Sequence, residues 1–186
     1  MHLKTIQAGA LKTCFEVLKD ILNDVNVNFT SDGVNITTLD NAKVALINMN
    51  LDASKFEEYE CKESITAGVN ISNLFKIMKI ITSNDVVTIE VNNKEYMTII
   101  IENDVKNAKS VFELNLLWIN DDTLEIPELA SNCTTLLPSI DFQRICRDMA
   151  NIGTIVSIYR NKNILNISCS GDFAKQTTSI DTEQND

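Results

Sequence analysis

The sequence contains few of the residues that metal binding and covalent catalysis require. Its only histidine is His2, its five cysteines are widely spaced, and no C-x-x-C pair occurs. This scarcity argues against a zinc site, and the odd number of cysteines argues against a disulfide framework. The five glycines form no G-x-x-x-x-G-K phosphate loop, and no carboxylate cluster or nucleophile–base pair stands out. The sequence therefore does not favour an enzyme.

Long apolar runs are also absent. Nothing approaches the roughly 18 consecutive apolar residues that a membrane-spanning helix needs. The first residues carry Lys12 and Glu16 where a signal peptide would need an apolar core,. Hydrophobic residues make up 44% of the 186-residue chain and charged residues 23%, a balance typical of one large or two small folded domains. We expect an intracellular protein without membrane contact.

An internal repeat organises the chain. Residues 142–171 repeat the pattern of residues 11–40. In both copies a helical period of apolar residues gives way to strand alternation at the same place, and a polar turn, "SDG" or "RNKN", separates two strands. Each copy is therefore predicted to form helix, strand, tight turn, strand. The aligned apolar pairs are Leu11 and Phe142, Leu18 and Met149, Val25 and Val156, Val27 and Ile158, and Val34 and Leu165.

The rest of the first copy predicts more strands and a second helix. We expect a helix over residues 72–81 that begins at the N-cap Ser72, and strands at residues 44–51, 85–92, 96–102 and 108–116,. One repeat then forms two helices on one face of an antiparallel sheet, an α+β arrangement. The second copy is shorter, and we expect its domain to be incomplete. The predicted boundaries are a first domain at 1–115, a connector at 116–132 and a second domain at 133–186.

Basic residues recur on the predicted helices of a chain whose formal net charge is −10. Each helix carries two, away from its apolar stripe: Lys12 and Lys19 on the helix predicted at 9–22, Lys76 and Lys79 on helix 72–81, and Arg144 and Arg147 on the helix predicted at 140–151. One interpretation is an ordinary solvated helix face with weak surface ion pairs. The other is a basic face on an acidic body, which is typical of proteins that bind a polyanion. Because aromatic residues are scarce on these helices, and Phe15 and Phe142 belong to the apolar stripes, phosphate contact is favoured over base reading.

The connector and the strand at 44–51 are apolar where polar residues are expected. Val44 and Leu46 lie on the face of the strand opposite its core-facing residues, and Leu124 and Ile126 lie in the otherwise polar connector. These two sets could pack together and leave a groove for a partner, or they could pack without any ligand. The acidic pair Asp121–Asp122 could form a metal site or, more simply, a solvated loop.

Five motifs together resemble the proliferating cell nuclear antigen (PCNA) family, the sliding clamps of eukaryotic and some viral replication. In chain order they are "LKDILND", "DGVNITTLDNAKVAL", "AGVNISNLFKIMK", "LEIPE" and "FQRICRDMANIG". The resemblance spans essentially the whole chain. It implies a ring of three subunits with two similar domains each, helices lining the hole and sheets outside.

The resemblance also implies roles for individual residues. Six cations would face double-stranded DNA inside the ring: Lys12, Lys19, Lys76, Lys79, Arg144 and Arg147. A groove for DNA polymerase and other clamp-binding peptides would be formed by Leu39, Lys43, Val44, Leu46, Leu124, Ile126 and Pro127. Phe112 would lie at the subunit interface, facing strand 172–180 of a neighbour. Thr13 and Lys43 depart from the family, which often has a basic residue and a histidine there.

The function implied by the resemblance is a processivity factor without chemistry or cofactor. It would act in the nucleus, or at a viral replication site, and would require a clamp loader. Two alternatives are a checkpoint-type clamp subunit in a hetero-trimer and a metal-dependent DNA enzyme. The motif "LEIPE" and the basic helices favour the homotrimeric clamp.

Overall fold

The computed structural model describes residues 1–120 and 133–182. The chain divides into two compact units, unit 1 (Met1–Ile126) and unit 2 (Pro127–Asp186). Both combine helices with antiparallel sheets, which confirms the predicted α+β class.

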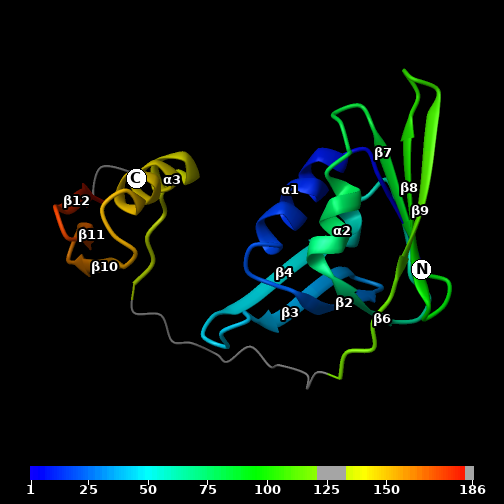
Figure 1. The fold of residues 1–186 in the computed structure, drawn as a ribbon, viewed down its shortest axis with the longest axis horizontal. Coiled ribbons are helices and arrows are strands. Elements are labelled where there is room, and N and C mark those ends of the chain that lie inside the picture. The colour runs from blue at the N-terminus through cyan, green and yellow to red at the C-terminus, as the bar shows by residue number, and fades with distance from the viewer. Residues whose placement is uncertain (121–132, 183–186) are drawn as a thin grey trace. The chain divides into compact units, whose positions relative to one another are not determined.

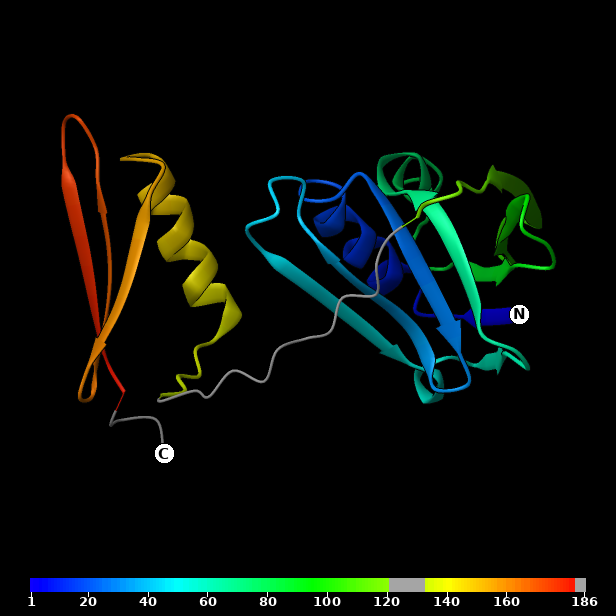
Figure 2. The ribbon, with the colours of Figure 1, turned by 90° about the horizontal axis from the view of Figure 1, so that it is seen from below.

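Unit 1 contains two antiparallel sheets and two helices. The four-stranded sheet has the order β4-β3-β2-β6 and the five-stranded sheet the order β5-β1-β7-β8-β9. Helices α1 and α2 lie side by side on one face of the four-stranded sheet (Figures 1 and 2). The helices are α1 (Ala8–Leu18) and α2 (Ile71–Met78); the strands are β1 (His2–Thr5), β2 (Asp24–Thr30), β3 (Gly33–Leu39), β4 (Leu46–Asp52), β5 (Glu58–Glu60), β6 (Ile65–Asn70), β7 (Val86–Glu90), β8 (Tyr96–Asn103) and β9 (Ala108–Asn115).

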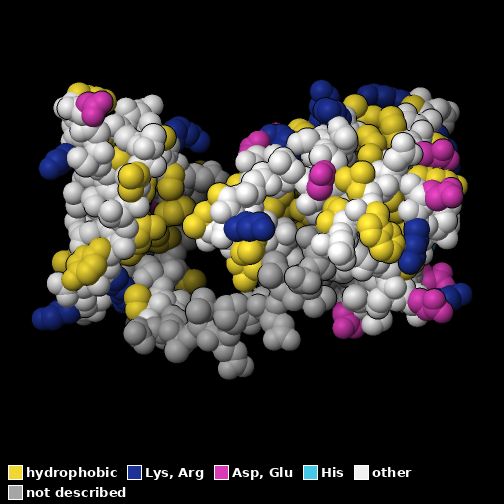
Figure 3. All heavy atoms as spheres, turned by 60° about the horizontal axis from the view of Figure 1, so that its bottom comes forward, with side chains coloured by type: hydrophobic (Ala, Val, Ile, Leu, Met, Phe, Trp, Pro, Cys, Tyr) yellow, Lys and Arg dark blue, Asp and Glu magenta, His cyan; other side chains and the backbone are white. Residues whose placement is uncertain are grey.

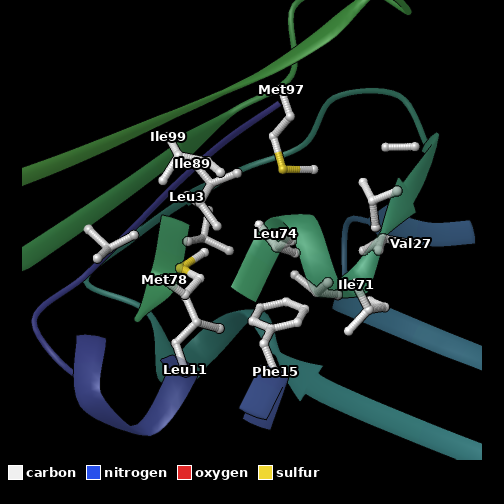
Figure 4. Close-up of a cluster of buried hydrophobic side chains, with 14 of the residues drawn as sticks. Leu3, Leu11, Phe15, Val27, Ile71, Leu74, Met78, Ile89, Met97 and Ile99 are labelled. Carbon is white, nitrogen blue, oxygen red and sulfur yellow. The ribbon is translucent and has the colours of Figure 1, made fainter. Parts of the chain in front are cut away.

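The core of unit 1 forms where the helices meet both sheets. Leu11 and Phe15 of α1 and Leu74 of α2 point toward Ile89 of β7 and Met97 of β8, and all five are buried (Figure 4). Because helix side chains three or four positions apart share one face, the predicted apolar stripes are the faces that the helices bury.

The two sheets of unit 1 are joined by the hydroxyl of Tyr59. Tyr59 belongs to β5, and its hydroxyl lies 2.7 Å from the carbonyl oxygen of Thr30 and 2.8 Å from that of Gly33. Burial raises the pKa of Tyr59 to about 12, so the hydroxyl keeps its proton and can donate. Gly33 has φ 145°, and a Cβ there would lie 2.0 Å from the carbonyl oxygen of Leu51, so this turn requires glycine.

Unit 2 contains one helix and three strands within its described residues. They are α3 (Ser139–Ala150), β10 (Val156–Asn161), β11 (Ile164–Ser170) and β12 (Lys175–Asp181), with strand order β10-β11-β12. Its core is small and centres on Ile145, Met149 and Ile167. The order α3–β10–β11 repeats α1–β2–β3, which confirms the predicted repeat.

Four details of the prediction were wrong. Helix α1 ends at Leu18, because residues 19–21 form a turn, and α2 begins at Ile71 rather than at 72. Its N-cap is Asn70, whose Oδ1 accepts a hydrogen bond of 2.9 Å from the backbone N–H of Asn73, and not Ser72. The first repeat forms two sheets rather than one layer, since the short strands β1 and β5 extend the second sheet.

Candidate functional site

The helices of unit 1 present their cations unequally. Lys76 and Lys79 are exposed on and just after α2. Lys19 is half-buried, since its Nζ lies 2.6 Å from Asp20 Oδ1 and 5.2 Å from the centre of the Phe75 ring. These three predicted DNA-facing lysines therefore differ in how freely they can reach a ligand.

Lys12 has a structural role that the sequence pattern did not reveal. Its Nζ donates hydrogen bonds of 3.0 Å to the backbone oxygens of Lys79 and Ile81. Carbonyls after the end of a helix lack partners within it, and a cation there also favours the helix dipole. Lys12 thus joins α1 to the end of α2, so its ammonium group is engaged with protein while Lys79 remains exposed.

Helix α3 of unit 2 carries two exposed arginines beside a buried stripe. Ile145 and Met149 are buried, whereas Arg144 and Arg147 are exposed. Arg144 pairs with Asp141 at 3.3 Å, a surface contact of little energetic weight. In unit 1, whose basic residues besides His2 are all lysines, several Lys side chains lie at the upper edge of the view and others at its left and right, while most of the visible Asp and Glu side chains lie toward the right and lower edges (Figure 3).

The loop before β4 is organised by one carboxylate. Asp40 Oδ1 accepts hydrogen bonds from the backbone N–H groups of Ala45 (2.8 Å) and Val44 (2.7 Å). These bonds hold the pKa of the Asp40 carboxyl below its ordinary value. Lys43 takes a positive φ of 58° in this loop, which closes the turn.

The two outward apolar residues that the pattern predicted are both exposed, but β4 begins at Leu46 rather than at residue 44, and Val44 lies in the loop before the strand. The Val44 side chain is 82% exposed and Leu46 is also exposed, while Leu39 is half-buried beside Leu46 in the β3–β4 pairing. The other predicted groove residues, Leu124, Ile126 and Pro127, lie outside the described residues, as does the pair Asp121–Asp122. The groove itself stays a prediction.

Strand β9 is an edge of the five-stranded sheet, and β12 is an edge of the sheet in unit 2. Phe112 of β9 is half-buried and packs against the core of unit 1, whereas its neighbour Val111 points outward and is exposed. The predicted subunit contact of Phe112 stays a prediction. A contact at this edge would involve the backbone of β9 and the exposed part of Phe112.

Neither a metal-binding cluster nor a membrane-spanning helix is found among the described residues. Among residues 1–120 and 133–182, no group of three or more His, Cys, Asp or Glu side chains is placed to hold a metal ion. No helix in the part of the chain that the structure describes is long and apolar enough to cross a membrane.

Comparison with known proteins places the chain in a family. The family model described as proliferating cell nuclear antigen, N-terminal domain, matches residues 1–124, and the C-terminal domain model matches residues 125–186. A protein of Paramecium bursaria Chlorella virus 1, named probable DNA polymerase sliding clamp 1, is 33% identical over 190 residues. That match covers 99% of this chain and 72% of the viral protein. The chain belongs to the proliferating cell nuclear antigen family.

Proposed function

We propose that the chain is a subunit of a DNA sliding clamp, a processivity factor that tethers DNA polymerase to its template. The proposal rests on the match of the two family domain models, which together cover the whole chain. The two units of the chain also repeat one arrangement of a helix followed by two strands. The viral relative named as a sliding clamp supports the same function. The proposed role needs no chemical step, because the clamp acts by staying on DNA.

The proposed DNA contact is electrostatic and independent of sequence. Exposed cations on α2 and α3 can approach phosphates, and the excess of acidic residues elsewhere would limit binding by other faces,. Of the six predicted residues, Lys76, Lys79, Arg144 and Arg147 are the freest to do so. Lys12 would contribute mainly through the placement of Lys79.

The proposed assembly is a homotrimeric ring, in which the β9 edge of one subunit pairs with the β12 edge of the next. Unpaired strand edges are usually covered in native proteins, and both edges are open within the described residues. A closed ring cannot thread onto circular DNA, so a clamp loader would be required. Such a clamp would act where DNA is replicated, in a nucleus or at a viral replication site.

The proposed function is tested by measuring whether the protein stays on circular DNA and leaves the same DNA after it is made linear. The protein is loaded on nicked circular DNA with a cognate loader, and the DNA is then cut once. A clamp that encircles DNA is retained on the circle and released after linearisation, because it slides off the ends. Equal retention on circular and linear DNA would show binding by local contacts and would contradict the proposal.

Arg147→Glu tests the proposal that α3 faces the DNA inside the ring. We expect weaker binding to duplex DNA and a flatter dependence on salt, by about one unit of slope or more. Lys62→Glu is the matched control, because Lys62 is highly exposed but lies outside the helices. If both variants lose the same affinity, net charge rather than the position on α3 determines binding.

The proposed partner groove uses the outward face of β4. A peptide with an aliphatic and an aromatic anchor would bury a few side chains there, at about 1.5–3 kcal/mol each, against the cost of ordering the peptide. Micromolar affinity is expected. Calorimetry on wild type and Leu46→Ser tests this, and an unchanged affinity would remove Leu46 from the groove.

A further inference from the structure

Helix α2 presents an asparagine beside one of its exposed lysines. Asn73 lies three residues before Lys76, and both side chains are exposed. Residues three apart on a helix are neighbours on its surface, and this surface lies away from the face that buries Ile71, Leu74 and Met78. The Lys76 Nζ donates a hydrogen bond of 2.9 Å to Asn73 Oδ1. The two side chains therefore form a polar pair on the outside of α2.

The hydrogen bond to Lys76 leaves the amide nitrogen of Asn73 available. An asparagine side chain has one acceptor oxygen and an NH2 group with two donors. The oxygen accepts from Lys76, and the amide nitrogen donates to no protein group within the described residues. The backbone N–H of Asn73 is used separately, as the donor to the N-cap Asn70. Asn73 and Lys76 therefore offer N–H donors side by side to a ligand.

The corresponding pair on α3 carries a different charge. Arg144 also has its partner three residues earlier, and its Nη2 lies 3.3 Å from Asp141 Oδ1. The carboxylate of Asp141 compensates the charge of the arginine, whereas the neutral amide of Asn73 leaves the full positive charge on Lys76. A cation with a neutral donor beside it suits a phosphate group, whose oxygens accept several hydrogen bonds.

The free cations of unit 1 lie on the same helix as Asn73. Helix α2 lies beside α1 (Figure 1), but the ammonium groups of Lys12 and Lys19 on α1 are engaged with protein oxygens. Lys76 and Lys79 are exposed and form no ion pair within the part of the chain that the structure describes. A phosphate that approaches the helices of unit 1 therefore finds its free cations on and just after α2.

We propose that Asn73 is a further DNA-contact residue, whose amide N–H donates a hydrogen bond to the phosphate that Lys76 binds. This inference rests on the proposed function as a DNA clamp, and it adds a neutral residue to the six predicted cations. Side-chain amides contact phosphates in protein–DNA complexes without reading the sequence. A neutral donor releases no counterion, so its contribution to affinity does not depend on salt.

The inference is tested on a short fluorescent DNA duplex, with binding measured by anisotropy over a range of salt concentrations. Asn73→Ala should weaken binding about fivefold at every salt concentration, whereas Lys76→Gln should reduce the salt slope by about one unit. Alanine keeps the backbone N–H that Asn70 accepts and favours a helix more than asparagine does. The matched control is Asn92→Ala, at an exposed asparagine outside the helices, which should bind like wild type.

The double variant separates a DNA contact from mere placement of Lys76. A residue that only positions Lys76 has no effect once that lysine is replaced, but the fivefold loss from Asn73→Ala should remain in the Lys76→Gln protein. The inference is overturned if Asn73→Ala binds like the Asn92→Ala control, or if its effect disappears in the double variant.

Failure of the proposed function gives a different result. Wild type would then be retained equally on circular and on linear DNA, whatever Asn73→Ala does to the affinity for the short duplex. If wild type is retained only on circular DNA and Asn73→Ala still binds the duplex like wild type, the clamp function stands and the role of Asn73 is wrong. A wild-type protein that does not bind the duplex at low salt would overturn both.

Discussion

Unit 1 covers its copy of the repeated framework with a second helix and a second sheet, whereas unit 2 leaves part of its copy open. The apolar stripe of α1 is buried from Leu11 to Leu18, but the equivalent stripe of α3 is buried only around Ile145 and Met149. Periodicity in sequence therefore identifies the face that a helix can bury. How far that face is buried depends on neighbours that come from distant parts of the chain.

The largest expected difference between the units concerns matched core positions. Leu11→Ala should lower the free energy of unfolding of unit 1 by about 3 kcal/mol, because it leaves a cavity in a close-packed site. Phe142→Ala should lower the free energy of unfolding of unit 2 by about 1 kcal/mol or less, since the side chain already borders an open cavity,. Denaturation followed by the hydrogen exchange of β2 and β10 amides would report each unit separately. Equal losses would show that the Phe142 site is covered in solution.

Lys12→Gln should lower the free energy of unfolding of unit 1 by about 1 kcal/mol, because the end of α2 loses two charge-assisted hydrogen bonds on a half-exposed surface. The counterpart of Lys12 is Gln143, so Gln143→Lys is the reverse change in unit 2. That variant should alter stability by less than about 0.5 kcal/mol. Thermal unfolding of both variants measures the difference. A Lys12→Gln protein as stable as wild type would show that these hydrogen bonds contribute nothing.

Gly9→Ala should stabilise α1 by about 0.5 kcal/mol, because alanine loses less backbone entropy in a helix. An added Cβ at Gly9 meets no atom within 4 Å, and the counterpart Ile140 shows that unit 2 accepts a large side chain there. A rise in the unfolding midpoint would confirm the prediction. A fall would mean that the start of α1 is packed against a partner in solution.

The smallest expected effect is the loss of the Asp40 hydrogen bonds in the loop before β4 when Asp40 is protonated at acid pH. The pKa of Asp40 is lowered by the backbone N–H groups of Ala45 and Val44, so its contribution to the loop is complete above the ordinary Asp pKa. That contribution is lost only below the ordinary Asp pKa of about 4, as the pH falls through the lowered value. Amide chemical shifts of Val44 and Ala45 should follow this titration, and Asp40→Asn should abolish it. The corresponding turn in unit 2 has Gly171 in place of Asp40 and is closed by a backbone bond to Ala174.

The sequence predicted those parts of the fold that local pattern determines. The repeat, the helical stripes and the outward exposure of Leu46 follow from side-chain periodicity, and the structure agrees. Val44 is exposed for a different reason, because it lies in the loop before β4. Strands β1 and β5 were missed because four and three residues carry too little alternation to detect. They exist because β1 pairs with β7 on one side and with β5 on the other. The six-residue strand β6 was missed as well.

The candidate site could be predicted in its residue types but not in its contacts. Asn70 and Ser72 are both good N-cap residues, and only the point at which β6 ends decides between them. Lys12 resembled the other helical cations in sequence, yet its partners lie at residues 79 and 81. The roles of the groove residues and of Phe112 stay predictions, because they depend on other molecules.

Tyr59 gives unit 1 a mechanical property. Its hydroxyl contacts two backbone oxygens at the β2–β3 turn of one sheet, while its own backbone is part of the other sheet. The single proton of this hydroxyl is donated to one of these oxygens or shared between them, and a sliding motion of one sheet against the other would break that interaction. A molecule pulled along DNA by a moving polymerase experiences shear, and this phenol resists shear at the edge of the core. Single-molecule pulling of Tyr59→Phe against wild type would measure the lost resistance as a lower unfolding force.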